Sequence, residues 1–379
     1  MKAPIITLII TLSAFALSAQ EKPPTLSLQP YGFVRMNATL DFQEMGNSDL
    51  FRPALIPIEP TSSKAPHLFL SAKQSRLGLK IEKDVQGQRI QGRIEGDFHS
   101  NANQTGGLIR LRHAYFQYQG WTIGQTWSNF YDIQSRAKIV DFEGANSEAL
   151  YRVPQLRYTF KRPQQEISLS LEHPTEQITT TDEVQVSKQL LPDLVAAWKF
   201  RWGKDNFIKV AALTRQLRYG RPANDQPEAM ELASLWAGGM MASAKIKTTA
   251  SDYLKMQVIG GKGLARYIRG VRNLGYDAIC LDECNELEAI GILGSFLAYE
   301  HHWSENWSST LVLGGVDIRQ VDAFEADDLD YCIYGSGNLF FEPASDLSVG
   351  LEYLHGEKRE VSGRSGQAHR LQMAATLRF

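Results

Sequence analysis

The sequence has no long hydrophobic run, few cysteines and no excess of charge of one sign. Beyond the N-terminal segment no stretch of about eighteen apolar residues occurs, which excludes membrane-spanning helices. The 40 Lys and Arg residues nearly balance the 42 Asp and Glu residues, so there is no electrostatic basis for a nucleic-acid partner. The 379 residues contain no low-complexity tract, no linker and no convincing helix longer than a few turns, which indicates a single domain.

Only three cysteines are present. Cys280 and Cys284 enclose three residues in Cys-Leu-Asp-Glu-Cys, and an exported chain meets an oxidising compartment, so we expect a disulfide between them that clips a loop. A metal site would need further ligands nearby, and the sequence brings no carboxylates together around His113, His301 or His302. We therefore expect no metal and no cofactor.

The N-terminal segment has the features of a secretory signal. Lys2 supplies the positive charge, residues 5–17 form a short apolar core, and Leu17-Ser18-Ala19 offers a small-residue cleavage site. We expect residues 1–19 to be removed as a signal peptide and residues 20–379 to form one exported domain. With no cysteine near the cleavage site, the sequence does not indicate a lipoprotein.

Apolar and polar residues alternate along many segments of the chain. Val34, Met36 and Ala38 alternate with Arg35 and Asn37, as expected of strands with one apolar and one polar face. A soluble sandwich would show the same alternation. The polar faces carry repeated Arg, Glu and Asp, and no separate set of buried strands is present that could form a core. Both features favour strands whose apolar face meets lipid and whose polar face lines a water-filled lumen.

The last segment alternates in the same way, with Leu371, Met373 and Leu377 on one face before a final Phe379. An amphipathic strand that closes on an aromatic carboxy-terminus resembles the assembly signal of bacterial outer-membrane barrels. We therefore expect the barrel-assembly machinery to recognise this strand.

The pattern predicts an all-β fold, a transmembrane antiparallel β-barrel of about sixteen strands. The predicted strands are 31–42, 68–83, 88–99, 108–119, 121–127, 153–162, 165–173, 193–202, 206–218, 232–247, 252–265, 286–301, 306–321, 330–342, 346–357 and 367–379. Short links such as 84–87 and 203–205 alternate with long ones such as 43–67 and 266–285, as periplasmic turns alternate with external loops. The phase of 108–118 can be read either way, and 286–299 is apolar on both faces.

A barrel of this size leaves an aqueous channel, so passive diffusion of small polar solutes is the function that we expect. A non-conducting barrel with an adhesive or structural role is the alternative, since external loops could plug the pore. An enzyme is not indicated, because no Ser–His arrangement has a persuasive spacing and no Gly-x-Ser-x-Gly elbow occurs.

Selectivity in such a channel depends on its narrowest point and the charges there. We expect the long segment 129–152 to fold into the lumen, with Asp132, Arg136, Asp141 and Glu143 at the constriction. The basic residues predicted to line the pore are Arg35, Arg76, Arg93, Arg110, Arg112 and Arg157. Guanidinium groups stay charged and bind carboxylates with paired hydrogen bonds, which suits anionic solutes. Alternatively, Glu95 and Asp97 lie close enough in sequence to neutralise Arg93.

Three stretches resemble the DcaP-like family of trimeric outer-membrane porins. They are Gln74-Ser75-Arg76-Leu77-Gly78, Gly92-Arg93-Ile94-Glu95-Gly96-Asp97-Phe98, and Leu111-Arg112-His113-Ala114-Tyr115-Phe116 running to Gly124-Gln125-Thr126-Trp127-Ser128. The likeness is specific over roughly residues 68–132. It implies a sixteen-stranded homotrimeric porin in outer-membrane lipid, with a preference for anionic solutes such as dicarboxylates.

The sequence departs from this family before the first strand. The better-known members carry an N-terminal coiled coil, whereas here Pro23, Pro24 and Pro30 exclude a heptad repeat between the cleavage site and the barrel. We therefore expect the trimer to depend on contacts between barrels alone.

Overall fold

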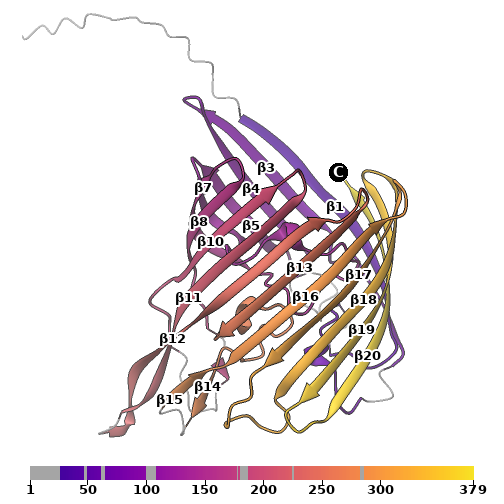
Figure 1. Cartoon of the computed structure of the whole chain (residues 1–379). Helices are drawn as coiled ribbons and strands as arrows, with labels where there is room; N and C mark the ends of the chain where they lie inside the picture. Colours follow the sequence, from indigo (N-terminus) through magenta and orange to yellow (C-terminus); the bar gives the residue numbers. More distant parts are fainter. Residues whose placement is uncertain are drawn as a thin grey trace, which may run out of the picture.

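The chain folds into one closed antiparallel β-barrel with tilted strands (Figure 1). The computed structural model describes residues 26–46, 49–60, 65–99, 108–176, 178–179, 187–223, 226–281 and 286–379. The predicted signal peptide lies outside these residues, whereas the proline-containing segment that follows it is described from residue 26, where the first strand begins. Within the described ranges, none of the helices has the length and apolar character needed to cross a membrane.

The described part of the chain contributes seventeen strands to the sheet that forms the wall. They are β1 (Leu26–Asp41), β2 (His67–Ser71), β3 (Arg76–Val85), β4 (Gln88–Asp97), β5 (Arg110–Tyr118), β6 (Trp121–Trp127), β7 (Arg152–Lys161), β8 (Gln165–Glu172), β10 (Asp193–Trp202), β11 (Asn206–Ala223), β12 (Gln226–Lys247), β13 (Asp252–Lys262), β16 (Gly291–His302), β17 (Trp307–Ile318), β18 (Leu329–Ala344), β19 (Leu347–Glu360) and β20 (Ser365–Arg378).

The first and last strands close the wall. Strand β1 pairs with β20 in a register that runs from Phe33 opposite Arg378 to Asp41 opposite Arg370. Its other edge pairs first with β3 and then with β2, so these two strands are halves of one wall strand interrupted at residues 72–75. The described wall therefore has sixteen strand positions, and the predicted fold is confirmed.

The two faces of the wall differ as the alternation predicts. Val34 and Leu311 point outward and remain 58% and 63% exposed, whereas Asn37, Thr39 and Gln257 point inward and are buried. An apolar exterior around a polar interior suits a barrel in lipid, because the bilayer solvates the exterior and water or paired charges satisfy the interior.

Tight turns join the strands at one end of the barrel. The β3–β4 turn has positive φ at both Gln86 and Gly87 (54° and 76°), and the β5–β6 turn has positive φ at Gln119 and Gly120 (45° and 87°). Two left-handed residues in succession match the right-handed twist of the flanking strands, so each hairpin is made with two residues. The long connections lie at the other end.

Three of the long connections fold into the barrel. They contain the short helices η1 (Pro53–Leu55), η3 (Ile133–Ser135) and η4 (Ala265–Tyr267). Phe130 and Leu150 from the second connection pack against Tyr267 and Ile268 from the third, and all are buried. The hydrophobic core of the molecule therefore lies between the inner loops and the wall, and residues 129–151 lie inside the barrel together with two further loops.

The predicted strand 286–301 is wrong in its first third. It is divided into β15 (Glu286–Ala289) and β16, and only β16 belongs to the wall. Strand β15 pairs instead with β14 (Ala278–Leu281), which lies parallel to β9 (Ile178–Thr179) in a separate three-stranded sheet. Leu287 and Ala289 pack beneath the β11–β12 hairpin, which explains why the segment is apolar on both faces.

Candidate functional site

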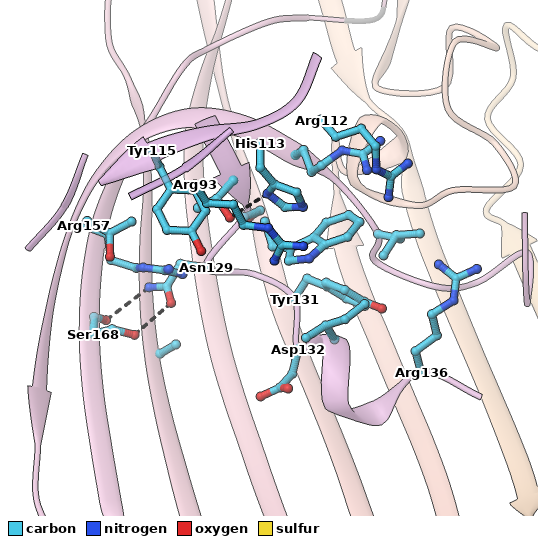
Figure 2. A pocket seen from close by; sticks show the side chains of 18 of the residues that line it. Arg93, Arg112, His113, Tyr115, Asn129, Tyr131, Asp132, Arg136, Arg157 and Ser168 are labelled. Carbon is cyan, nitrogen blue, oxygen red and sulfur yellow. Dashed lines mark hydrogen bonds between the residues drawn. The ribbon is translucent and has the colours of Figure 1, made fainter. Parts of the chain in front are cut away.

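A cavity of about 1020 Å³ occupies the barrel between the tight β5–β6 turn and the three inner loops (Figure 2). Twelve arginines and three lysines line it, against four carboxylates. The carboxylates are Asp132, Asp141, Glu143 and Glu166. The cavity is therefore strongly cationic, although the chain as a whole carries a formal charge of only -2.

The predicted site residues come together in this one cavity. Its lining includes Arg35, Arg76, Arg93, Arg110, Arg112 and Arg157 from the wall. It also includes Asp132, Arg136, Asp141 and Glu143 from the inner loop 129–151. The structure thus brings these residues together, and their roles in guiding solutes stay a prediction.

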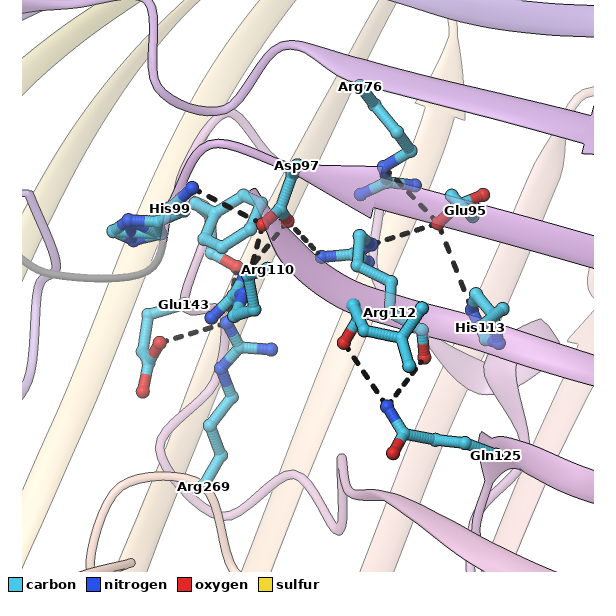
Figure 3. Close-up of polar contacts among 12 residues, drawn as sticks. Arg76, Glu95, Asp97, His99, Arg110, Arg112, His113, Gln125, Glu143 and Arg269 are labelled. Atoms are coloured by element: carbon cyan, nitrogen blue, oxygen red, sulfur yellow. Dashed lines mark hydrogen bonds and ion pairs between the residues drawn. The ribbon is translucent and has the colours of Figure 1, made fainter. Parts of the chain in front are cut away.

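Part of the basic wall is balanced by two carboxylates on β4 (Figure 3). This wall cluster consists of Arg76, Arg93, Arg110, Arg112, Glu95 and Asp97. Asp97 accepts two hydrogen bonds of 2.9 Å from Arg110 and one of 2.6 Å from Arg112. Glu95 accepts a 2.9 Å bond from Arg112, contacts Arg93, and lies 3.4 Å from the Nε of Arg76. Four guanidinium groups share two carboxylates, so the cluster keeps an excess of positive charge.

A β-bulge explains why the phase of β5 could not be read from the sequence. The pairing between β4 and β5 shifts register between Glu95 and Gly96, opposite Arg112. As a result the consecutive residues Arg112 and His113 are both buried on the lumen side. An extra residue in one strand reverses the alternation beyond it, which a strict period of two cannot describe.

Other arginines of the lining have no carboxylate within 4 Å in the described part of the chain. These are Arg35, Arg152, Arg157 and Arg272. The guanidinium of Arg152 lies 4.8 Å from the ring centroid of Trp127, and that of Arg272 donates to the carbonyl oxygen of Arg266 at 2.7 Å. A buried cation with only neutral partners is costly, and an anion entering the cavity would lower that cost.

The inner loops contact one another through a loop joint, formed by Arg52, Glu143, Asn146, Arg269 and Gly270. Arg269 pairs with Glu143 at 2.9 Å, and the amide of Gly270 donates to the carbonyl of Asn146 at 2.7 Å. Arg52 donates to the carbonyl of Gly270 at 3.0 Å. All three inner loops therefore meet at the end of the cavity opposite the tight turns.

The arginines of the loop joint keep the Glu143 side chain ionised. Burial raises the pKa of Glu143, but the attraction of Arg269 and Arg52 outweighs it, so the pKa lies below its ordinary value of 4.5. For Asp141, burial dominates over hydrogen bonds from the Gly144 and Glu143 amides and raises the pKa. Glu143 thus holds the loops together as a carboxylate over a wide pH range.

Asp132 and Asp141 also connect loop 129–151 to the wall, the first through its carboxylate and the second through its backbone amide. Asp132 caps η3 by accepting from the Gln134 amide at 2.9 Å, and it contacts Lys199 on β10. The amide of Asp141 donates to Glu352 on β19 at 2.6 Å. Of the four lining carboxylates, Asp132, Glu143 and Glu166 each contact a basic side chain, so most of the cavity charge without an opposite partner is positive.

Five arginines that line the cavity are not among the site residues predicted from the sequence. They are Arg52, Arg89, Arg152, Arg269 and Arg272. A signal existed for two of them, since Arg266, Arg269 and Arg272 recur at intervals of three residues in one predicted loop. Without knowledge that this loop turns inward, the spacing had no structural meaning.

The structure describes one of the two cysteines predicted to form the loop disulfide. Cys280, in β14, is disulfide-bonded, but Cys284 lies outside the described residues, so the predicted pairing stays a prediction. Cys332 is free and buried in β18, where its sulfur accepts from Asn146 at 3.0 Å. No group of three or more His, Cys, Asp or Glu side chains that could hold a metal occurs in the described ranges.

Solved structures share this architecture. The outer membrane channel DcaP of Acinetobacter baumannii matches with a TM-score of 0.81 at 22% identity, covering 93% of this chain and 97% of that one. The trimer form of OmpT of Vibrio cholerae matches at 0.59 with 11% identity, and OmpF of Salmonella typhi in complex with daunomycin at 0.57 with 13% identity. They cover 93% of this chain and 99% and 97% of their own chains.

Comparison with curated proteins found no match. The family model described as DcaP outer membrane protein, in contrast, matches residues 10–379, nearly the whole chain. The match extends the resemblance seen over residues 68–132 to the complete barrel. The match establishes that this chain belongs to the DcaP outer membrane protein family, and the sixteen-position wall with its apolar exterior is the β-barrel expected of an outer-membrane protein.

Proposed function

We propose that this chain is a porin through which small anionic solutes, dicarboxylates among them, diffuse passively along an arginine-lined lumen. The observation that carries the proposal is the composition of the cavity lining, with fifteen basic side chains against four acidic ones. Guanidinium groups keep their charge at every physiological pH and accept carboxylates in a bidentate geometry. Such a lining raises the local concentration of anions and excludes cations.

Uneven pairing along the lumen supports passage rather than tight binding. Arg112 is held between two carboxylates, while Arg152 and Arg157 have none within 4 Å among the described residues. A solute carboxylate can therefore exchange between neighbouring guanidinium groups, each of which binds it only moderately. Conduction requires sites of this kind, strong enough for entry and weak enough for release.

The assembly that we propose is a homotrimer of complete barrels. The support comes from the likeness to porins, one of which is described as a trimer form. We also propose that the strand ending at Phe379 is recognised by the barrel-assembly machinery. Loop 129–151, together with the two other inner loops, would form the constriction of each lumen.

Single-channel recording in a planar bilayer tests the function. Under a salt gradient we expect a reversal potential that reports anion preference, and added succinate should block the current in a concentration-dependent manner. Cation preference would retain the porin but contradict its anion selectivity. Absence of current from folded, heat-modifiable protein would favour the non-conducting barrel with an adhesive or structural role.

A charge reversal identifies the residues responsible. Replacing both Arg76 and Arg93 with Glu changes the lining by four charges, which should erase or reverse the anion preference while leaving the barrel folded. The matched control is Arg359→Glu together with Arg364→Glu, because neither residue lines the cavity. Unchanged selectivity in the double lumen variant would remove the wall arginines from the mechanism.

A further inference from the structure

Two histidines face each other on the outside of the barrel. His355 on β19 is directly opposite His369 on β20, and their ring centroids are 4.8 Å apart with 36° between the ring planes. Their neighbours Leu354 and Ala368 point inward and are completely buried, so alternation places both histidines on the outer face. This pair has no part in the channel described above.

The pair lies where the apolar exterior of these strands ends. On one side of it along the outer face are Tyr353 and Leu371, and on the other side the face continues with Glu357 and Gln367. Lipid therefore borders the pair on one side and water on the other. Both histidines are half-buried at this border.

Hydrogen bonding prepares the ring nitrogens for a ligand. The hydroxyl of Tyr353 lies 2.6 Å from the Nδ1 of His369, so Nε2 is the nitrogen of that ring left for a ligand; with a metal bound there, Nδ1 keeps its proton and donates it to the tyrosine oxygen. The Nδ1 of His355 is buried and has no hydrogen-bond partner in the described part of the structure. A coordination bond would satisfy that nitrogen.

The spacing of the rings fits shared coordination of one ion. With metal–nitrogen bonds of about 2.1 Å and ring centroids about 1.1 Å further on, two imidazoles at an angle of about 90–110° have centroids roughly 4.5–5.2 Å apart. The observed 4.8 Å falls inside this interval. A cross-strand pair also needs little reorganisation, because the sheet already fixes both backbones.

We infer that His355 and His369 form a site for a divalent transition-metal ion of the class that prefers imidazole ligands, such as Zn²⁺, Ni²⁺ or Cu²⁺. Hard ions such as Ca²⁺ and Mg²⁺ prefer oxygen ligands and do not fit. Since no larger group of ligating side chains converges in the described ranges, water completes the coordination and the ion exchanges readily. Bound there, the ion links β19 to β20, next to the seam where β20 meets β1.

Retention of tag-free, detergent-purified protein on Ni²⁺-charged resin tests the site, with Zn²⁺ titration by calorimetry as the second measurement. We expect retention that a low concentration of imidazole reverses, and one Zn²⁺ bound per chain. His355→Gln and His369→Gln should each abolish retention, while Tyr353→Phe should weaken Zn²⁺ binding about tenfold through loss of the oxygen that orients His369.

The control is His301→Gln. His301 and His302 are consecutive in one strand and point to opposite faces, so they do not form a comparable pair. It should leave retention unchanged. Heat-modifiable migration verifies that each variant is folded. Lack of retention of the folded wild-type chain, or retention undiminished by both single substitutions, would overturn the inference.

Discussion

Individual arginines in the lumen differ in whether a carboxylate lies beside them, and we expect those with and without such a partner to have different roles. Arg112 is 2.9 Å from Glu95 and 2.6 Å from Asp97, so its guanidinium is already paired within the wall cluster. Arg157 lines the same cavity with no carboxylate within 4 Å among the described residues. A solute anion gains most from a guanidinium that no protein carboxylate already occupies.

Arg157→Gln should therefore reduce anion preference more than the removal of one positive charge elsewhere on the chain. We expect a decrease of several-fold in the chloride-to-potassium permeability ratio, measured from the reversal potential, with little change in thermal stability. Arg359→Gln, at a residue outside the cavity lining, serves as the control. Equal effects of the two substitutions would show that only net charge matters.

Arg112→Gln should act on stability instead. The side chain is buried between two carboxylates, and removal of one partner from a buried ion cluster costs about 3 kcal/mol, less where lumen water screens the remaining charges. We expect a lower temperature of heat modification. Arg89→Gln, which removes an exposed ion pair with Glu82, should leave that temperature unchanged. The opposite order would contradict the assignment of a structural role to Arg112.

At the scale of elements, the strands were predictable because the alternation of apolar and polar residues repeats over whole segments. Lipid outside the barrel and charge inside it require this alternation. The wall arginines outside β5 followed from that phase, whereas Arg110 and Arg112 lie beside the bulge, where the phase could not be read. The inner loops have no period to read. Their positions depend on contacts with distant residues, such as Gly270 with Asn146, so the arginines of the third loop could not be placed.

The loop joint makes Gly270→Ala a test of the constriction. A Cβ at this position would lie 2.6 Å from the carbonyl oxygen of Asn146, so the two loops must separate. We expect single-channel conductance to rise and discrimination between small and large anions to fall. At Gly335 a Cβ would meet its nearest atom at 3.6 Å, and Gly335→Ala should conduct like the wild type. Unaltered conductance in Gly270→Ala would place the constriction elsewhere.

The same joint predicts a pH dependence. The folded pKa of Glu143 is depressed below 4.5, so its contribution to stability is present above the ordinary carboxylate pKa and is lost as the pH falls through the folded pKa. Conductance should stay constant from neutral pH to about pH 5 and change only at lower pH. Glu143→Gln should show the altered conductance already at neutral pH. A transition in the wild type above pH 6 would have to come from another group.

The whole molecule is a barrel whose wall closes within one chain. Nine residue pairs, from Phe33–Arg378 to Asp41–Arg370, join β1 to β20, so the wall needs no strand from another chain to close. A lumen of this kind is complete without a partner. If subunits associate, they do so through the apolar exterior, and each keeps its own lumen.

A trimer of such barrels should therefore conduct as three independent units. We expect light scattering to give a protein mass three times the 42.5 kDa of one full-length chain, less any signal peptide removed on export. Each insertion into a bilayer should then close in three equal steps, and a solute that blocks one lumen should remove one third of the current. Since the closed wall separates the lumens, Arg157→Gln should change the size of each step equally. A trimeric mass with one indivisible conductance would mean that subunits share a pore, which a self-closed wall does not allow.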